Sequence, residues 1–424
     1  MQTVLSQPPA VNRTAIRARY LRNRQRSVDI FSLVDERAYY DRPIPLRHPF
    51  AFYQGHIPAF SFFTLNEHSL GEAPVDPGLE KLFERGIDPE SESAAAAHAP
   101  NQWPDKQQIE AFADTCDARV LAAFAGAVLE DAGNPRLVQG QAVFTILEHE
   151  EMHHETLLYL VHQLPYEFKE FRKYTHHDAT PPPYSSRHID AGVATLGAER
   201  ERQQFGWDNE FRSLEVNEPA FEIDTFPVTN ADYLEFVRAG AAPPRFWIER
   251  DGHWKLRAMF EEVVLPASWP VYASHAEAEA YARWKGMRLP TEAQYHRAAF
   301  SAPDGSERSF PWGNETPEHK HGNFDLQRYD PEPVNAHPAG VSAWGVHDLI
   351  GNGWEWTATP FAPLPGFEPM ASYPQYSVDF FDDQHYVMKG ASPVTAREHL
   401  RRSFRNWYRA EYPFMYAKFR CARS

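Results

Sequence analysis

The stretch "ILEHEEMHHETLLYL", residues 146–160, carries apolar residues at three- and four-residue steps within a longer run that extends over 136–164. This spacing is typical of a helix with one buried face. His149 and His153 are four positions apart, so their imidazoles point to the same side of the helix. Together with Glu150 they form H-E-x-x-H, the pattern of zinc peptidases in which the glutamate is the general base. The stretch therefore predicts a buried helix with two candidate metal ligands, although in a chain with 20 histidines this spacing can also arise by chance.

Further helical periodicity surrounds this stretch and predicts an antiparallel four-helix bundle with long crossovers. The other three predicted helices cover 14–34, 52–70 and 106–130, with Pro58 near the start of the second. Residues 88–102, rich in Ser, Ala and Pro, predict a flexible loop between the second and third helices. The arginines between positions 13 and 26 favour a solvated helix face over a binding patch.

The helical pattern breaks at "HHDATPPPYSSRH", residues 176–188, because three consecutive prolines cannot continue a helix. We therefore predict a helical domain over 1–178 and a proline-rich linker over 179–187. The remainder, 188–424, has short segments with many Gly, Pro and Trp residues, which favours an irregular α+β domain.

Composition excludes several classes of protein. The formal net charge is −16, which argues against nucleic acid as a partner, since phosphate binding needs clustered Lys and Arg. The two cysteines, Cys116 and Cys421, are too few for a disulfide framework and suit a reducing cytoplasm. No signal-peptide pattern and no run of about 18 apolar residues is visible. We therefore expect a soluble, cytoplasmic protein with no membrane partner.

A third histidine supports the metal hypothesis. In "HPFAFYQGHIPAF", residues 48–60, His56 lies among apolar and aromatic residues on a predicted neighbouring helix, and facing helices of a bundle can assemble metal sites. Taken alone, His56 would be interpreted as a hydrogen-bonded core histidine. A zinc peptidase would need a further ligand downstream and a catalytic domain built around the motif helix, so it stays a minor alternative.

The C-terminal half resembles the formylglycine-generating-enzyme-like, C-type-lectin-like fold. The resemblance rests on "FGWDNEF" (205–211), "FEIDTFPVTNADYLEF" (221–236), "RLPTEAQYHRAAF" (288–300), "GVHDLIGNGWEWT" (345–357), "RRSFRNW" (401–407) and "FRCAR" (419–423). Formylglycine formation depends on a cysteine pair in this domain, and Cys421 stands alone, so that activity is not expected. In "GNGWEWT" we interpret Gly351 and Gly353 as turn residues, and Trp354 and Trp356 as core.

The N-terminal half resembles the DinB-like bundle, and the two halves together resemble the non-haem iron sulfoxide synthases of ergothioneine and ovothiol biosynthesis. In that family three histidines bind Fe(II), and by motif they fall on His56, His149 and His153. The family uses O2 to couple a thiol to the imidazole of a histidine derivative, which in the ergothioneine branch is hercynine. Because zinc has no redox role, oxidative coupling implies iron. An aromatic pocket would suit the quaternary ammonium of hercynine.

Departures from the family pattern bear on the chalcogen donor. The arginine-containing loop of the enzymes that use γ-glutamylcysteine has no counterpart, and Met152 stands where those enzymes commonly have Gln. "LRHPFAFYQGH", "LFERGID" and "HEEMHHETLLY" look closer to the ovothiol-type synthases, which carry an additional C-terminal methyltransferase domain that is not seen before Ser424. The sequence is therefore most similar to the selenoneine synthases, which join a selenosugar to hercynine.

The resemblance also implies an active-site tyrosine upstream of the turn "MKGAS", residues 388–392. Tyr376 aligns best with this role, and Tyr373 and Tyr386 are the alternatives; each could instead be a buried tyrosine with a satisfied hydroxyl. Substrate contacts fall in 406–419. Three consecutive residues there are the candidates: Phe414 and Tyr416 as an aromatic wall, and Met415 in place of an acidic residue of the sulfur-donor pocket.

Other functions remain open from the sequence. One is a hercynine sulfoxide synthase that uses cysteine or γ-glutamylcysteine. Another is an O2-independent, DinB-type, metal-dependent thiol transferase with the same three histidines. A third is a ligand-binding protein without catalysis, which predicts no bound iron. The sequence does not determine the donor, the position of attack on the imidazole or the oligomeric state.

Overall fold

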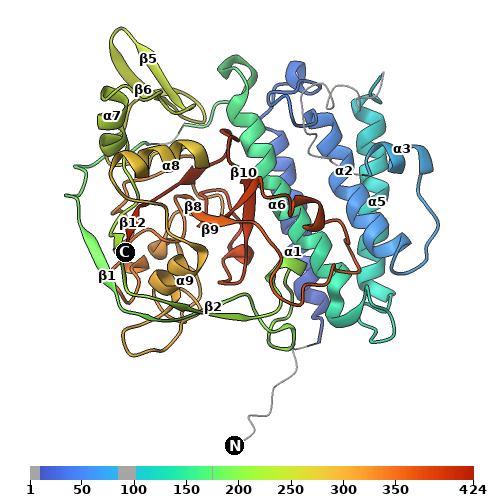
Figure 1. Ribbon diagram of the computed structural model, residues 1–424. Helices are drawn as coiled ribbons and strands as arrows, with labels where there is room; N and C mark the ends of the chain where they lie inside the picture. The colour runs from blue at the N-terminus through green and yellow to red at the C-terminus, as the bar shows by residue number, and fades with distance from the viewer. Residues whose placement is uncertain (1–9, 85–101, 174) are drawn as a thin grey trace, which may run out of the picture. The chain divides into compact units, whose positions relative to one another are not determined.

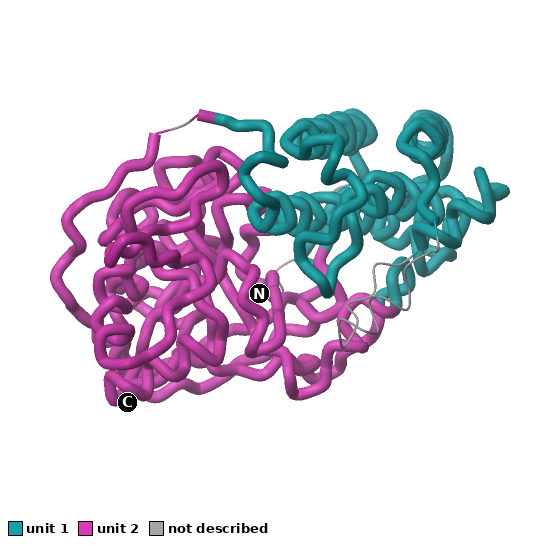
Figure 2. The backbone as a smooth tube through the Cα atoms, turned by 90° about the horizontal axis from the view of Figure 1, so that it is seen from above, with its two compact units in different colours: residues 1–172, 201–205, 370–374 teal, residues 173–200, 206–369, 375–424 magenta. Residues whose placement is uncertain are grey.

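The computed structural model describes residues 10–84, 102–173 and 175–424 (Figure 1). They form two compact units, which Figure 2 shows in different colours. The first unit spans residues 1–172 and also takes in 201–205 and 370–374, and the second contains the rest. The predicted flexible loop over 88–102 lies, except for its last residue, outside the described residues.

The first unit is built on long helices, as the periodicity predicted. They are α1 (Arg13–Phe31), α2 (Phe50–Phe62), α5 (Lys106–Gly126) and α6 (Gln141–Gln163), with the short α3 (Pro77–Leu82) between α2 and α5. Helices α1 and α2 each pack against both α5 and α6. This confirms the predicted helical bundle. No helix among the described residues is both long enough and apolar enough to cross a bilayer.

Local sequence signals set where these helices begin. The side chain of Asn12 accepts a hydrogen bond from the N–H of Ala15 at the start of α1. Asp105 and Gln108 form a reciprocal capping box at the start of α5. Gly140, which has a φ of 70°, precedes α6, and a Cβ at this position would collide with Val11. The start of the helix that carries the H-E-x-x-H motif therefore depends on a glycine.

Helix α2 departs from the expectation for its proline. Pro58 lies in the interior of α2 rather than near its start, and a π-helical turn over Phe63–Glu67 follows directly. A proline has no N–H to donate within a helix, which weakens an interior turn. Every residue of α2 except Gln54 is buried, so packing on all sides holds the helix in place. His56 therefore projects from a helix that lies deep in the bundle.

The second unit is an α+β domain, as predicted. Its main sheet has the order β10 (Asn406–Arg409), β9 (His385–Ala391), β8 (Gly353–Pro360), β11 (Ala417–Lys418). A second sheet has the order β1 (Ser186–Ile189), β4 (Phe221–Asp224), β12 (Ala422–Arg423). Both neighbours of β4 are antiparallel to it, so the first and last strands of the unit pair with the same central strand.

Smaller elements complete the second unit. They are the hairpin-like pair β2 (Gly192–Leu196) and β3 (Leu214–Glu218), the sheet β5 (Trp247–Arg250), β6 (His253–Arg257), β7 (Glu262–Val264), and the helices α7 (Asn230–Arg238), α8 (His275–Trp284) and α9 (Glu292–Phe300). Helix α9 packs on β2, β3, β8 and β9. Its buried face joins the hydrophobic core formed with β1 and β4.

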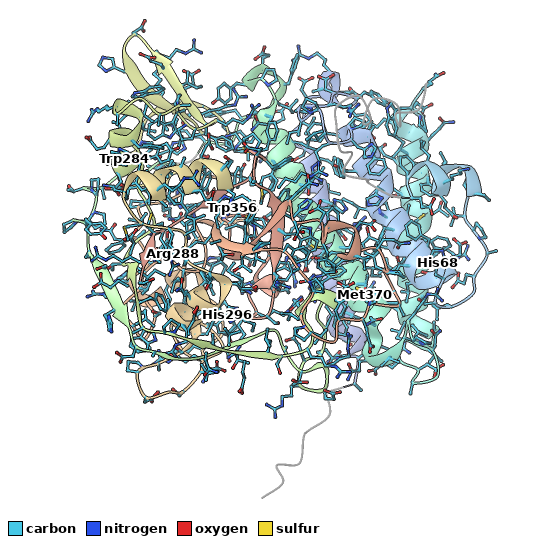
Figure 3. All side chains as sticks on the ribbon, viewed as in Figure 1. His68, Trp284, Arg288, His296, Trp356 and Met370 are labelled. Atoms are coloured by element: carbon cyan, nitrogen blue, oxygen red, sulfur yellow. The ribbon has the colours of Figure 1, made fainter. Side chains whose placement is uncertain are left out.

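The "GNGWEWT" motif has the structural role that we predicted. Trp354 and Trp356 are buried, and the Trp356 indole donates to the carbonyl of Ala273 at 2.9 Å. Figure 3 labels Trp356 among the side chains that fill this unit. Gly351 has a φ of 94°, and a Cβ there would lie 2.7 Å from the backbone of Asn323. The motif supplies a tight turn and core tryptophans.

The stretch predicted as a linker is anchored to the second unit, whose first residue is Lys173. The carboxylate of Asp178 accepts hydrogen bonds from the N–H groups of Ala267 and Ser268, both at 3.0 Å. The N–H of Ala179 donates to the hydroxyl of Ser268 at 3.0 Å. The beginning of the predicted linker is therefore bonded to the second unit, and the linker bounds 179–187 stay a prediction. Cys116 and Cys421 are both buried free thiols.

Candidate metal centre

Three histidines of the first unit come together in the bundle. His56 projects from α2, and His149 and His153 project from α6 one turn apart. One nitrogen from each ring lies within 4.8 Å of the other two. The Nε2 atoms of His149 and His153 are 3.1 Å apart. We call these three residues the histidine triad; they are the residues that the sequence predicted as metal ligands.

The backbone fixes the orientation of His56. Its Nδ1 lies 2.7 Å from the carbonyl oxygen of Phe83, the residue that directly follows α3. A carbonyl can only accept, so Nδ1 carries the proton and Nε2 keeps its lone pair. A second hydrogen bond of this kind is the usual way in which proteins orient a metal-binding histidine. The short helix α3 thereby positions one corner of the triad.

Burial keeps the triad neutral. It lowers the pKa of His56 to about 4, although the hydrogen bond to Phe83 acts in the opposite direction. The pKa values of His149 and His153 lie well below the usual value, first because of burial and then because of the neighbouring histidines. Metals bind the neutral imidazole, so each ring is in the form that a ligand requires.

The spacing of the triad fits a first-row metal ion. Two nitrogens each about 2.1 Å from one ion are about 3.0 Å apart at a right angle and about 3.4 Å apart at the tetrahedral angle. The 3.1 Å between the two Nε2 atoms on α6 lies within this range and nearer its octahedral end. Without a metal, one ring can donate an Nε2–H to the other at this distance, and with both lone pairs free the same distance suits a shared cation. The donor set therefore fits a metal with further coordination positions open.

Glu150 does not face the triad, which separates this site from a peptidase. Its carboxylate accepts from the Arg24 guanidinium at 3.0 Å and from the Ser27 hydroxyl at 2.6 Å, and both residues lie on α1. The Ser27 hydroxyl also lies 3.0 Å from Nε2 of His154. Burial alone would raise the pKa of Glu150, but Arg24, His154 and Ser27 together lower it below the usual value, so the carboxyl stays ionised. In this position Glu150 cannot serve as the base for a metal-bound water.

The next residue forms a second clamp between α6 and α1. Both carboxylate oxygens of Glu151 accept from the Arg19 guanidinium, at 2.8 and 2.6 Å, and Asn23 donates to one of them at 3.1 Å. Arg19 and Arg24 are each only 16% exposed at the side chain. The expectation of a solvated arginine face is therefore wrong for these two residues. Their charges hold the ligand helix against α1.

Aromatic rings line the triad. Phe60 stacks on His149, with ring centroids 3.5 Å apart and planes 12° apart. Tyr53 lies 5.4 Å from His153. Tyr373, from the segment 370–374 of the first unit, lies edge-on to Phe60 at 5.1 Å and to His149 at 6.2 Å. The surroundings of the triad are thus largely apolar, with tyrosines among them.

The segment that carries Tyr373 is attached to the ligand helix. The hydroxyls of Ser372 and Thr145 are 2.8 Å apart, and Thr145 lies one turn before His149 on α6. Met370, labelled in Figure 3, begins this segment and is buried. Tyr373 therefore contacts His149 within one compact unit, although the two residues are more than 200 positions apart in the chain.

The other two candidate tyrosines lie in the second unit. Tyr376 stacks on Trp207 at 3.9 Å and meets Trp407 edge-on at 5.2 Å. Tyr386 stacks on His275 at 3.7 Å. These contacts give both rings a fixed place in that unit. The catalytic role predicted for Tyr376 stays a prediction.

The predicted substrate contacts have mixed surroundings. Met152 is half-buried on α6, directly before His153. In the second unit Phe414 is half-buried beneath the guanidinium of Arg245, 4.1 Å from the ring centroid. Met415 and Tyr416 are buried, and Tyr416 stacks on Tyr272 at 5.4 Å. A role in substrate binding stays a prediction for all four.

Several features of the site carry no signal in the sequence. The carbonyl of Phe83, the stacking ring of Phe60 and the α1 partners of Glu150 come from positions that no motif marks. Phe60 could have been found from its spacing, since it lies four residues after His56 on the same helical face. The others depend on tertiary packing.

Two family models match the chain. The description "Sulfatase-modifying factor enzyme 1-like domain" matches residues 176–424, and the DinB superfamily matches residues 19–157. These matches agree with the α+β unit and the helical unit described above. The predicted resemblance of each half is thereby confirmed.

Curated relatives combine both halves. The "Hercynine oxygenase" of Mycolicibacterium thermoresistibile is 32% identical over 91% of this chain and 89% of its own length. The protein of the same name from Mycobacterium tuberculosis is 40% identical over 50% of this chain, a match that covers 54% of that protein. "Ergothioneine biosynthesis protein 1" of Neurospora crassa is 28% identical over 90% of this chain and 54% of its own length. The chain therefore belongs to the family that joins a DinB domain to a sulfatase-modifying factor enzyme 1-like domain and includes the hercynine oxygenases.

Proposed function

We propose that this protein is an Fe(II)- and O2-dependent enzyme that forms a carbon–chalcogen bond on the imidazole of hercynine, with a selenosugar as its preferred donor. The observation that carries the proposal is the neutral histidine triad, in which His56 and His149 are buried and His153 is half-buried. The name of the relative from Mycolicibacterium thermoresistibile, which matches 91% of this chain, supports hercynine as the substrate.

The donor set supports iron over zinc. Three neutral imidazoles leave coordination positions for O2 and substrates, and iron would supply the redox chemistry that zinc lacks. A zinc peptidase would need Glu150 as its general base, but the Glu150 carboxylate is hydrogen-bonded to Arg24 and Ser27 instead. Binding of a metal by neutral rings also requires no proton release at neutral pH.

The proposed reaction balances as a four-electron oxidation. One imidazole C–H bond and one Se–H bond are lost, and one C–Se bond forms. O2 accepts the four electrons; one oxygen atom ends on selenium as a selenoxide and the other leaves as water with the two hydrogens. With a thiol donor the same balance gives a sulfoxide. The chain itself has to hold both substrates and to deliver protons to the reduced oxygen.

A tyrosine is the proton donor that the site offers. Alignment to the "MKGAS" turn predicts Tyr376, whereas ring contacts favour Tyr373, which lies in the same unit as the triad and 6.2 Å from His149. A tyrosine hydroxyl can donate one proton and accept another hydrogen bond. The tether between Ser372 and Thr145 would restrict the motion of Tyr373 relative to α6.

The surroundings also suit the substrate. Hercynine carries a quaternary ammonium and a carboxylate on one imidazole. Aromatic faces near the triad, such as those of Tyr53 and Phe60, suit the ammonium. The positive charge of Arg47 is close enough to His153 to help lower its pKa. The same charge would attract the carboxylate of hercynine if it bound near His153.

The preference for a selenosugar rests on residue types. Met152, next to a ligand, and Met415 are uncharged where a γ-glutamylcysteine site would use an amide and a carboxylate. Charged peptide thiols are recognised by bidentate and charge-assisted hydrogen bonds, and thioethers cannot supply them. A neutral sugar loses less by their absence, and selenium is the softer, more readily oxidised donor.

The test is a competition under air after anaerobic loading with Fe(II). Hercynine is supplied with a selenosugar, its thio analogue, cysteine and γ-glutamylcysteine at equal concentrations, and products are identified by mass spectrometry. We expect the selenosugar adduct to dominate, with the thio analogue slower. A clear preference for cysteine or γ-glutamylcysteine would make the protein a sulfoxide synthase, the function suggested by the relatives named for ergothioneine biosynthesis.

The same reaction without O2 tests the third function. A DinB-type thiol transferase would form product anaerobically, whereas oxidative coupling cannot proceed without an electron acceptor. Product formation in strict anaerobiosis at the aerobic rate would therefore refute the proposal. Oxygen uptake in step with product would support it.

A further inference from the structure

The second unit contains a cavity that has no part in the histidine triad. Its volume is about 310 Å³, within the range of small-molecule sites. It lies between the stretch 182–185, the end of β4, helices α7 and α8, and the C-terminal strand β12. All of these segments belong to the second unit.

A buried carboxylate lines this cavity. Asp224, at the end of β4, is 6% exposed. Its Oδ2 accepts the N–H of Cys421 at 2.9 Å, which ties β4 to β12. Its buried Oδ1 has no partner within hydrogen-bonding geometry, although the Tyr184 hydroxyl lies near this carboxylate and 3.9 Å from the sulfur of Met287. Burial raises the pKa of Asp224 to about 6, and the hydrogen bond from the Cys421 N–H, the nearby charge of Arg420 and the Tyr184 hydroxyl act against this rise.

An unpaired buried carboxylate oxygen is unfavourable, and a donor inside the cavity would relieve it. Leaving a buried acceptor unsatisfied costs on the order of 1–3 kcal/mol, and more when the group is charged. The Cys421 N–H already occupies one oxygen, so the structural role of Asp224 leaves the other available. A cationic donor would form a charge-assisted hydrogen bond with it.

The walls of the cavity are apolar and aromatic. Tyr281 on α8 is buried, and its ring is fixed by stacking on Tyr233 at 5.4 Å and by an edge contact with Phe419 at 5.4 Å. Phe226 and Val228, from the segment after β4, also line the cavity. Such walls suit the hydrocarbon part of a ligand, and the aromatic faces also attract a cation.

The charged groups at the cavity differ in burial and in whether they already have a partner. Asp232, on α7, is an exposed carboxylate that already accepts hydrogen bonds from the N–H and the hydroxyl of Thr229. Arg423 is already paired with Glu222. Lys285 is exposed and lies 5.1 Å above the indole of Trp284, which Figure 3 labels on α8. The carboxylate of Asp224 is therefore the buried charged group of the cavity, and the positive charges are at the surface or paired.

We propose that this cavity binds a small organic ammonium ion, with the ammonium group on Asp224 and its apolar part between Tyr281 and Phe226. A metal ion suits the cavity less well, because among the described residues the group of three ligating side chains within reach of one ion is the histidine triad. The proposal does not rest on the function of the triad.

The test uses the full-length protein without added metal and benzylamine as the probe. Binding is measured by calorimetry, with benzyl alcohol and benzoate as neutral and anionic probes of the same shape. We expect saturable binding of benzylamine with a Kd of about 1 mM or lower, and at least tenfold weaker binding of the other two. Asp224→Asn, which keeps an oxygen for the Cys421 N–H, should weaken benzylamine binding at least tenfold. The matched control is Asp190→Asn, an exposed aspartate on the turn after β1, which should leave binding unchanged.

A second pair of variants tests the proposal even if the Asp224→Asn variant does not fold. Lys285→Glu changes an exposed side chain at the rim and should tighten benzylamine binding about threefold or more, because a positive charge is replaced by a negative one. Lys81→Glu, the same change on α3 in the first unit, should have no effect. Equal binding of benzyl alcohol and benzylamine, no saturable binding of benzylamine, or no response to Lys285→Glu would each overturn the proposal.

Discussion

Replacing Glu150 by Gln separates a structural role for this carboxylate from a catalytic one. In the wild-type protein Glu150 is fully buried and bonded to Arg24 and Ser27. Gln has the same shape and can still accept from Ser27, but it removes the charge opposite Arg24. The substitution therefore leaves a buried guanidinium that has lost its main counter-charge.

The structure sets the size of the effect. Removing one partner of a buried ion pair destabilises a protein by roughly 3–5 kcal/mol. Arg24 keeps a weaker partner in Asp117, whose carboxylate is 3.7 Å away and 25% exposed. We therefore take the lower end, about 3 kcal/mol. For a unit of this size, about 1 kcal/mol lowers Tm by roughly 2–4 °C, so the melting of the first unit should fall by roughly 6–12 °C.

The assay combines thermal unfolding with metal analysis. Below the lowered melting temperature, Glu150→Gln should bind Fe(II) in the same ratio as wild type and should turn over at a rate within about threefold of wild type, a barrier change under about 1 kcal/mol. Glu170→Gln, at an exposed position, is the matched control and should change neither property. A variant that melts within about 1 °C of wild type yet loses turnover 100-fold would place Glu150 in the chemistry and refute this account.

Three further predictions follow from the site and from the second unit. Replacing any one residue of the histidine triad by Ala should abolish both Fe(II) binding and turnover; near wild-type iron content in two of the three variants would show that the triad is not the metal site. Tyr373→Phe should keep iron and hercynine binding while slowing the oxidative coupling at least tenfold, whereas an effect of this size in Tyr376→Phe alone would move the role to the residue favoured by alignment. Glu355→Gln should destabilise the second unit by roughly 3 kcal/mol, because it leaves Arg420 buried without its carboxylate, but the Fe(II) content of the folded protein should not change.

The sequence was sufficient for features that depend on local spacing. Helical periodicity identified the long helices of the first unit, and the four-residue step identified His149 and His153 as neighbours. The proline run predicted a change of architecture at residues 179–187, and the second compact unit begins at Lys173. These features follow from backbone geometry over a few residues, which a single sequence records directly.

Features that depend on distant partners were not predictable in this way. H-E-x-x-H has the same local geometry in a peptidase and here, and only the presence of Arg24 and Ser27 on α1 shows where Glu150 points. The expectation of solvated arginines was wrong for a similar reason. Arg19 and Arg24 lie on the face of α1 that packs against α6, and spacing alone does not show which face of a helix is covered. Alignment to a turn favoured Tyr376, while tertiary packing brings Tyr373 to His149.

The composition of the first unit has a consequence for the order of events during synthesis. The helices that carry the histidine triad are complete by residue 163, but the segment 370–374 belongs to the same compact unit. At a translation rate of about 5–20 residues per second, roughly 10–40 s separate the two. During this interval the nascent bundle holds its histidines without Tyr373 beside them. An emerging chain could therefore acquire its metal before the residue proposed to control its oxygen chemistry has left the ribosome.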